Sequence, residues 1–422
     1  MKRLRRRKRI RKEEAFLKTI AIAGTFDSKG KEYLYVKSLV EELGLKPYMI
    51  NTGVFEPEFE PDVSNEVVAA EAGYNLKEIA EKKDRALATE ALSKGMEKIV
   101  PRLYNEGKFD GILSFGGSGG TSLVTPAMRA LPIGVPKLMV STMASGDVAR
   151  YVGTSDIIMM PSIVDVAGLN QISKLIFRNA VLAMAGMVSC GNKLAEDTEE
   201  HKPLIAATMF GVTTPCIEQA KEYLENEGYE VMVFHATGTG GKTMESLIDA
   251  GFFAGVLDLT TTEYCDEVVG GILAAGPDRC GAAIRQKVPQ VVSVGACDMV
   301  NFGEMDSVPE QFKHRNLYKH NPAVTLMRTT VEENVEIAHR LAEKWNEAQR
   351  KMVLMLPKRG VSMIDAEGQP FDGPEERKTL FDTLKKEIQN DNVEIIEMDN
   401  NINDEEFAVT AAKTLLNLMG KQ

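Results

Sequence analysis

Cysteine and long apolar segments are both scarce in this chain of 422 residues. Its five cysteines are scattered and include no C-x-x-C pair, so the sequence predicts neither a disulfide framework nor a structural zinc site, and reduced thiols are expected. No apolar run reaches the roughly 18 uncharged residues that a membrane-spanning helix needs, and the N-terminus lacks the apolar core of a secretory signal. These absences predict a cytoplasmic protein without a membrane partner.

Positive charge is concentrated at the N-terminus. Residues 2–12 carry nine lysines and arginines, and since the whole chain has a formal net charge of −11, the remainder carries −20. A basic tail could contact nucleic acid, but so acidic a body would repel a polyanion, and short basic runs are more often solvated arms. We predict a disordered basic tail over residues 1–17 and no nucleic-acid partner.

Apolar runs of strand length alternate with stretches of helical periodicity along the rest of the chain. Hydrophobic residues make up 44% of the sequence and aromatic residues 6%, which is ordinary for packed α/β proteins. The alternation predicts two Rossmann-like, doubly wound domains with mostly parallel sheets and a cleft between them. A polar stretch over residues 190–203 places the predicted domains at 18–200 and 201–422.

Small polar residues follow the predicted strands, where ligands bind in such sheets. A glycine-rich loop over residues 114–122 lies between an apolar strand, 109–113, and a predicted helix, 123–131. Its four glycines would let the backbone approach a ligand, with amide N–H groups and the helix dipole directed at an anion. A phosphate fits this loop, although a glycine-rich turn can also serve only to pack a helix closely on a sheet. Between the second strand, 46–51, and a helix over 84–106, residues 54–84 are predicted to be a long loop.

A second glycine-rich loop follows a strand in the second half, at residues 235–243 (HATGTGGKT). With Ala236 in the place of the first glycine it fits a relaxed P-loop pattern, and Asp258, after an apolar strand, could hold Mg²⁺. Against a true P-loop, alanine is less permissive there, and the strand is the second of its domain rather than the first. A loop that binds a carboxylate or phosphate without hydrolysing a nucleotide is the alternative.

Catalytic candidates are isolated in the sequence. Cys297 follows a strand and could be a nucleophile with His235 as its base, but a small buried residue that fills a gap is the more common role for cysteine. Glu263 and Asp298 could act as general acid and base or as metal ligands. Arg359 suits a bidentate contact with a carboxylate or phosphate, or a solvated surface position.

Six motifs in order carry a family resemblance. They are residues 24–30 (GTFDSKG), 116–121 (GGSGGT), 234–241 (FHATGTGG), 258–263 (DLTTTE), 357–362 (PKRGVS) and 401–404 (NIND). From residue 19 onward the chain resembles an uncharacterised protein family that is best known from the ATP-binding N-terminal domain of the tomato mosaic virus resistance protein. The resemblance implies a Rossmann-like first domain that binds ATP, and a homodimer. Mg²⁺ is expected because ATP normally arrives with it.

The resemblance also implies the nucleotide contacts. The predicted contacts are Gly24, Thr25, Asp27, Ser28, Lys29, Gly116, Gly117, Ser118, Gly119, Gly120, Thr121, Ser145, Gly146 and Asp147.

Two functions remain open from the sequence. The first is an ATP-binding protein that regulates a protein partner through its nucleotide state. The second is an ATP-dependent enzyme, for phosphoryl transfer or ligation, that acts on a small anionic substrate between the domains. Its predicted substrate contacts are His235, Thr237, Gly238, Thr239, Gly240, Gly241, Lys242, Glu263, Asp298, Arg359 and Asn403. The sequence leaves open which of the two glycine loops holds the nucleotide.

Overall fold

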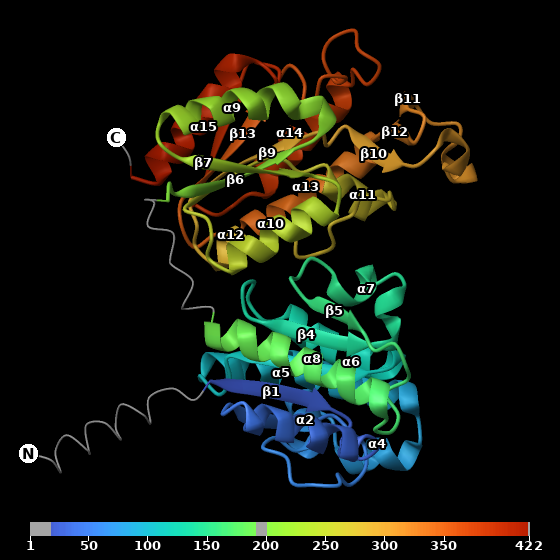
Figure 1. The fold of residues 1–422 in the computed structure, drawn as a ribbon. Coiled ribbons are helices and arrows are strands. Elements are labelled where there is room, and N and C mark those ends of the chain that lie inside the picture. The colour runs from blue at the N-terminus through green and yellow to red at the C-terminus, as the bar shows by residue number, and fades with distance from the viewer. Residues whose placement is uncertain (1–17, 191–200, 421–422) are drawn as a thin grey trace, which may run out of the picture. The chain divides into compact units, whose positions relative to one another are not determined.

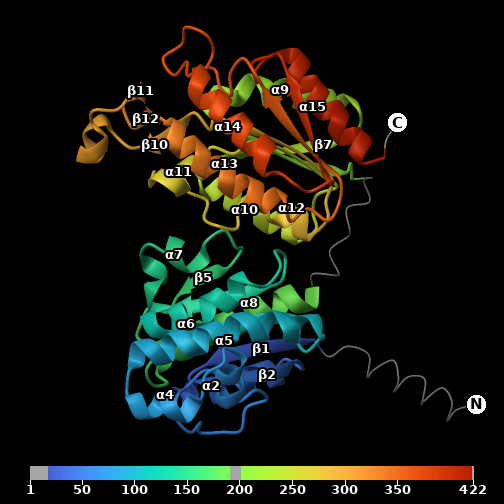
Figure 2. The same ribbon diagram turned by 180° about the vertical axis from the view of Figure 1, so that it is seen from behind.

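A computed structural model describes residues 18–190 and 201–420 (Figures 1 and 2). The chain divides into two compact units, numbered 1–199 and 200–422, which are described separately below. The predicted basic tail and most of the predicted polar linker lie outside the described residues.

The first unit is built on a parallel sheet, which has five strands within residues 18–190, in the order β2-β1-β3-β4-β5. The strands are β1 (Thr19–Gly24), β2 (Lys46–Asn51), β3 (Gly111–Gly116), β4 (Lys137–Ser141) and β5 (Ile158–Pro161). The helices are α2 (Gly30–Glu42), α3 (Asn65–Glu71), α4 (Leu76–Lys82), α5 (Arg85–Asn105), α6 (Ser118–Arg129), α7 (Ala149–Val152) and α8 (Gln171–Cys190), with a 3₁₀ turn η1 (Thr142–Ser145).

Helices cover both faces of this sheet, so its strands are apolar on both sides. Alternate strand residues such as Ala21 and Ile112 pack under α3, α5 and α6, whereas Ile22 and Leu113 pack against α2 and α8. A parallel sheet buried on both faces is expected to have near-continuous apolar strands, as this one has.

Helix α8 has the length and mean hydropathy, 1.3, of a membrane span. Its buried residues, including Phe177, Val181 and Met184, pack with α2 and with β3 and β4, and the helix carries Lys174 and Arg178. Only 33% of its apolar window is buried, and Ile172, Leu175 and Leu182 are exposed, so covering the sheet accounts for only part of its apolar composition.

The second unit contains a larger parallel sheet and a small antiparallel one. Within residues 201–420 the parallel sheet has six strands, in the order β14-β13-β9-β8-β6-β7, and the antiparallel sheet has three, in the order β10-β12-β11. The parallel strands are β6 (Leu204–Met209), β7 (Glu230–His235), β8 (Gly255–Thr260), β9 (Gln290–Gly295), β13 (Met352–Pro357) and β14 (Val393–Met398); the antiparallel strands are β10 (Met299–Phe302), β11 (Leu317–Asn321) and β12 (Val324–Arg328). The helices are α9 (Thr214–Asn226), α10 (Thr239–Asp249), α11 (Glu263–Val269), α12 (Ala282–Arg285), α13 (Val331–Trp345), α14 (Pro374–Glu387) and α15 (Glu405–Leu418), with 3₁₀ turns η3 (Gly211–Thr213), η4 (Met305–Ser307) and η5 (Glu310–Phe312).

Helices again cover both faces (Figure 1). Val291 and Met355 pack under α9 and α15, and their neighbours Val292 and Leu354 pack under α13 and α14. The predicted α/β fold with two mostly parallel, doubly wound sheets is therefore confirmed.

Three local features differ from, or were absent from, the sequence prediction. The antiparallel sheet was not foreseen, and the predicted loop over 54–84 contains α3 and α4. Ser64 and Asn75 cap these two helices by accepting amide hydrogen bonds, which a reading for glycine and proline overlooks. The glycines of both loops also lie partly inside helices, because α6 begins at Ser118 and α10 at Thr239.

Candidate functional site

A cavity of about 680 Å³ opens at the carboxyl ends of β1, β2 and β3 in the first unit. In this sheet β1 and β3 are neighbours. The next strand after β1 in the sequence, β2, lies on one side of this pair, and the next strand after β3, β4, lies on the other side. This is the topological switch point, where open α/β sheets bind ligands. The cavity therefore lies where the fold predicts a ligand site.

The first glycine loop forms the polar wall of this cavity. Gly117 is the N-cap of α6, and no side chain caps the helix. The amide of Thr121 donates to the carbonyl of Gly117, so the amides of Ser118, Gly119 and Gly120 precede the first intrahelical bond. A β-carbon at Gly117 would have only Thr142 Oγ1 near it, at 3.7 Å. The loop thus offers amide donors to an anion and leaves room for it.

Three cationic side chains line the same cavity. Lys29, Lys83 and Arg85 all line the cavity. Arg85 is the first residue of α5, and its Nη2 would be 3.1 Å from a β-carbon at Gly119. A cation at the positive ends of two helices is unfavourable by itself and favourable once an anion lies between them. The charge arrangement therefore fits an oxyanion at Arg85 and Gly119.

Carboxylates also line the cavity, at Asp27, Asp84 and Asp165. Asp27 Oδ2 accepts the amides of Val54 and Phe55, each at 2.9 Å, and Asp84 caps α5. No cluster of three or more His, Cys, Asp or Glu that could hold a metal by itself is found within 18–190 and 201–420. A divalent cation here would need ligands from a bound phosphate.

Three buried polar side chains near the loops, Asn51, Thr52 and Ser114, each have an atom without a hydrogen-bond partner among the described residues. Thr52, at the end of β2, is 1% exposed and lines the cavity, yet its Oγ1 has no hydrogen-bond partner among the described residues. Next to it, Asn51 Nδ2 is also unpartnered, although its Oδ1 accepts the amides of Phe26 and Gly53. An unpaired buried hydroxyl costs about 1–3 kcal/mol, so the Thr52 hydroxyl fits a ligand contact.

The cavity lining is also partly apolar. Ile79 of α4, Leu92 of α5 and Leu123 of α6 line it, as does Phe55, which is 65% exposed. A lining that combines apolar contacts with amide donors and cations suits a ligand that joins an aromatic ring to an anionic chain.

The second glycine loop has a different environment. The Glu263 carboxylate accepts the amides of Gly238, at 2.6 Å, and of Gly241, at 3.2 Å, both through Oε1. A β-carbon at Gly241 would be 2.3 Å from Glu263 Oε2, and one at Gly240 would be 1.8 Å from the carbonyl oxygen of His235. These glycines are explained by contacts within the chain, and the N-terminus of α10 is occupied by the protein's own carboxylate.

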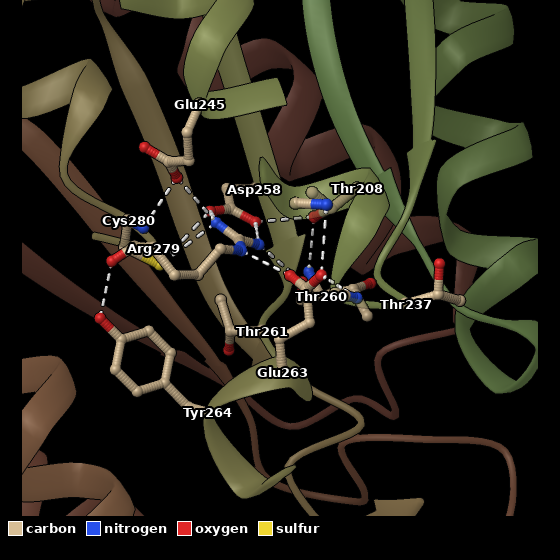
Figure 3. Close-up of polar contacts among 12 residues, drawn as sticks. Thr208, Thr237, Glu245, Asp258, Thr260, Thr261, Glu263, Tyr264, Arg279 and Cys280 are labelled. Atoms are coloured by element: carbon tan, nitrogen blue, oxygen red, sulfur yellow. Dashed lines mark hydrogen bonds and ion pairs between the residues drawn. The ribbon is translucent and has the colours of Figure 1, made fainter. Parts of the chain in front are cut away.

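Arg279 fixes Glu263 in that position (Figure 3). Its Nε donates to Glu263 at 2.6 Å, its Nη2 to Asp258 at 2.7 Å and its Nη1 to Glu245 at 3.2 Å. Arginine and all three carboxylates are buried, and burial raises the pKa of Glu245. Asp258, predicted as a Mg²⁺ ligand, is thus held in a bidentate ion pair.

Three of the remaining predicted substrate contacts, Thr237, Arg359 and Asn403, have hydrogen-bond partners within the chain. Arg359 pairs with Asp399 at 2.7 Å on the surface, and Asn403 contacts η3 and α9 by donating to the carbonyl of Val212 and accepting the amide of Cys216. His235, Thr239 and Lys242 lie at the end of β7 and the start of α10, and Thr237 Oγ1 donates to the His235 carbonyl. The Cys297 thiol is fully buried, 3.4 Å from Thr261 Oγ1, in agreement with a packing role.

Asp298 is a buried acid beside a second acid. Its Oδ2 accepts the Ser362 hydroxyl at 2.8 Å, and its Oδ1 has no partner among the described residues. Burial, followed by the charge of Asp365, raises the pKa of Asp298 from 3.8 to about 7.

Asp298 should make the second unit less stable as the pH rises. Because its pKa is raised on folding, the folded state holds the proton more tightly; the stabilisation is present below pH 3.8 and lost as the pH passes through about 7. In Asp298→Asn, the decline in the denaturant midpoint between about pH 5 and about pH 7.5 should be smaller than in the wild type. The fluorescence of Trp345, the single tryptophan, which is buried in this unit, reports the transition.

The matched control is Asp399→Asn. Arg359 lowers the pKa of Asp399, so this exposed acid does not titrate in that interval and its replacement should leave the decline unchanged. Equal slopes for the wild type and Asp298→Asn would contradict the prediction.

The cavity brings together most of the predicted nucleotide contacts. The predicted residues that line it are Gly24, Thr25, Asp27, Ser28, Lys29, Gly116, Gly117, Ser118, Gly119 and Gly120. Thr121 faces Ser141 instead, with 2.6 Å between the two hydroxyl oxygens, and Ser145, Gly146 and Asp147 are not among the lining residues. The sequence reading missed Thr52, Phe55, Lys83, Arg85 and Asp165. Thr52 and Asp165 had a signal, because each lies in a polar stretch that follows a predicted strand.

Fold and site together define an α/β protein of two parallel-sheet units, the first of which has a ligand-sized cavity at the switch point of its sheet. The chain belongs to the uncharacterised protein family UPF0261. The N-terminal domain of that family matches residues 18–193, and its C-terminal domain matches residues 202–419.

Relatives cover most of the chain. A UPF0261 protein of Clostridium tetani is 54% identical over 405 residues, which are 96% of this chain and 100% of that protein. The ToMV resistance protein Tm-1 of Solanum lycopersicum is 45% identical over 343 residues, which are 80% of this chain but 45% of that protein. Among solved structures, a thioesterase domain from the curacin biosynthetic pathway covers 52% of this chain and 90% of its own at 10% identity, with a TM-score of 0.25, which is too low to bear on function.

Proposed function

We propose that the first unit binds ATP in the cavity at the ends of β1, β2 and β3. The triphosphate would accept hydrogen bonds from the free amides at the start of α6, with Lys29 and Arg85 as counter-charges. The adenine would lie among the apolar side chains of α4, α5 and α6. The family resemblance noted from the sequence points to the same ligand.

One observation carries this proposal: the two glycine loops differ in what their amides contact. In the second unit, Glu263 accepts the amides of Gly238 and Gly241. In the first unit, the start of α6 has no side-chain cap and faces a cavity that also contains the unpartnered Thr52 hydroxyl. An anion from outside the chain would satisfy donors in the first unit, whereas in the second it would have to displace a buried carboxylate.

Mg²⁺ would enter with the nucleotide. It keeps several waters and takes one or two carboxylates together with phosphate oxygens. Asp165, and Asp27 through its Oδ1, line the cavity and could provide those carboxylates. The ion would neutralise part of the charge of the triphosphate.

Regulation of a protein partner through the nucleotide state stays our prediction for the biological role, and an ATP-dependent enzyme acting on a small anionic substrate is the alternative. The homodimer and the cytoplasmic location likewise stay predictions.

Thr52→Val separates ligand binding from folding. Valine has nearly the shape of threonine and removes a buried hydroxyl that has no partner within the protein, so the free energy of unfolding should stay unchanged or rise by up to about 1 kcal/mol. Loss of a hydrogen bond to the nucleotide should weaken ATP binding by about tenfold, measured by titration calorimetry.

Thr325→Val is the matched control, because Thr325 is an equally buried threonine whose Oγ1 also lacks a partner, but it lies on β12 of the second unit. It should have the same small effect on stability and none on ATP affinity. If Thr52→Val and Thr325→Val bind ATP equally well, Thr52 does not contact the nucleotide.

A further inference from the structure

A groove of about 830 Å³ lies behind the first glycine loop, between α5, α6 and α7. Four residues, Arg85, Thr89, Ser118 and Gly119, line both this groove and the cavity described above. The two spaces therefore meet at the first turn of α6, where the last phosphate of a bound nucleotide would lie.

Positive charge predominates in the groove. Its lining contains four cations, Arg85, Lys94, Arg129 and Arg150, and two carboxylates, Glu90 and Glu97. Lys94 and Glu90 neutralise each other in an exposed pair at 2.6 Å. The lining then has three arginines and one carboxylate, so it is net positive. The chain beyond residues 2–12 is, by contrast, strongly acidic. Such a local excess of positive charge attracts small anions.

Two of the arginines are held in place by Tyr151. Arg129 donates to the Tyr151 carbonyl at 2.7 Å, and Arg150 donates to the Tyr151 hydroxyl at 2.6 Å while its guanidinium lies 4.7 Å from the centre of the ring. Burial lowers the pKa of Arg129. Each guanidinium has five N–H donors, so these contacts leave donors for a ligand. Positioned arginines suit the paired oxygens of a carboxylate or phosphate.

We propose that this groove binds a second anionic ligand, a small molecule with carboxylate or phosphate groups. Arg129 and Arg150 bind its anionic groups, and Arg85 lies between it and the nucleotide. Its position beside the last phosphate rests on the proposed nucleotide site; the binding of the anion itself does not. An acceptor or co-substrate of ATP-dependent chemistry would occupy such a place.

Citrate is a suitable probe of the ligand-free full chain by titration calorimetry. We expect one site, weakened about tenfold in Arg150→Gln by the loss of a charge-assisted contact. Ser122→Glu, which adds a negative charge on the exposed α6 side of the groove, should prevent binding, and Ser122→Gln should not. Arg178→Gln, on α8 and outside the groove lining, should bind as the wild type does.

Failure of this inference differs from failure of the nucleotide site. Gly117 lines the cavity but not the groove, so Gly117→Val should retain citrate binding. The proposal that the groove binds an anion is overturned if citrate does not bind, or if neither Arg150→Gln nor Ser122→Glu changes the citrate affinity. If citrate binding is lost only in Gly117→Val, citrate binds in the nucleotide cavity instead. That result also overturns the proposed groove site, but it is compatible with the proposed ATP site.

Discussion

Gly117→Val is expected to weaken ATP binding by about 100-fold or more without unfolding the first unit. The valine would add bulk at the N-cap of α6, a residue that lines the cavity and adjoins the amides proposed to bind the triphosphate. Loss of two charge-assisted hydrogen bonds at about 1.5 kcal/mol each corresponds to that change in affinity.

The fold should tolerate this substitution. Gly117 has φ −79° and ψ −162°, an extended conformation open to any residue, and a β-carbon there has one neighbour, Thr142 Oγ1, at 3.7 Å. The control is Gly186→Val on α8, where a β-carbon meets nothing within 4 Å. It should leave ATP affinity unchanged. Equal ATP affinities for the two variants would contradict the phosphate position.

Arg279→Met should destabilise the second unit by about 3–5 kcal/mol, the cost of removing one partner from a buried ion pair. Arg279 is 2% exposed and contacts Glu245, Asp258 and Glu263, which would be left buried without a counter-charge. The denaturant midpoint, followed by Trp345 fluorescence, measures the effect.

Arg285→Met provides the comparison from the same neighbourhood. Arg285 pairs with Asp249 at 2.7 Å, but both side chains are more than one-third exposed, so the loss should be below about 1 kcal/mol. Similar losses in the two variants would show that the buried cluster does not hold the unit together.

The sequence could predict the layers of this fold because each strand is an apolar run and each covering helix has its own periodicity. Predicted strand 46–51 coincides with β2, and predicted helix 84–106 contains α5. Residues 54–84 were read as a loop because α3 and α4 have seven residues each, too few for a clear helical period. Their caps, Ser64 and Asn75, were the available signal.

The two glycine loops looked alike in the sequence because both follow a strand and precede a helix. What distinguishes them is Glu263, which is 22 residues from Gly241 in the chain and is oriented by Arg279, farther along still. No local pattern encodes such a long-range ion pair. Ile79 and Leu92 were missed for a related reason: an apolar residue at helical spacing predicts core, and only the three-dimensional structure reveals which core positions face a cavity.

The central claim is that the glycine loop of the first unit binds the nucleotide and the glycine loop of the second unit does not. The most direct test is to compare the ATP affinities of Lys242→Ala and Gly117→Val by titration. The account predicts that Lys242→Ala binds ATP as the wild type does, because the amides at the start of α10 already contact Glu263, while Gly117→Val loses binding. Loss of ATP binding in Lys242→Ala alone would contradict the account and place the nucleotide in the second unit.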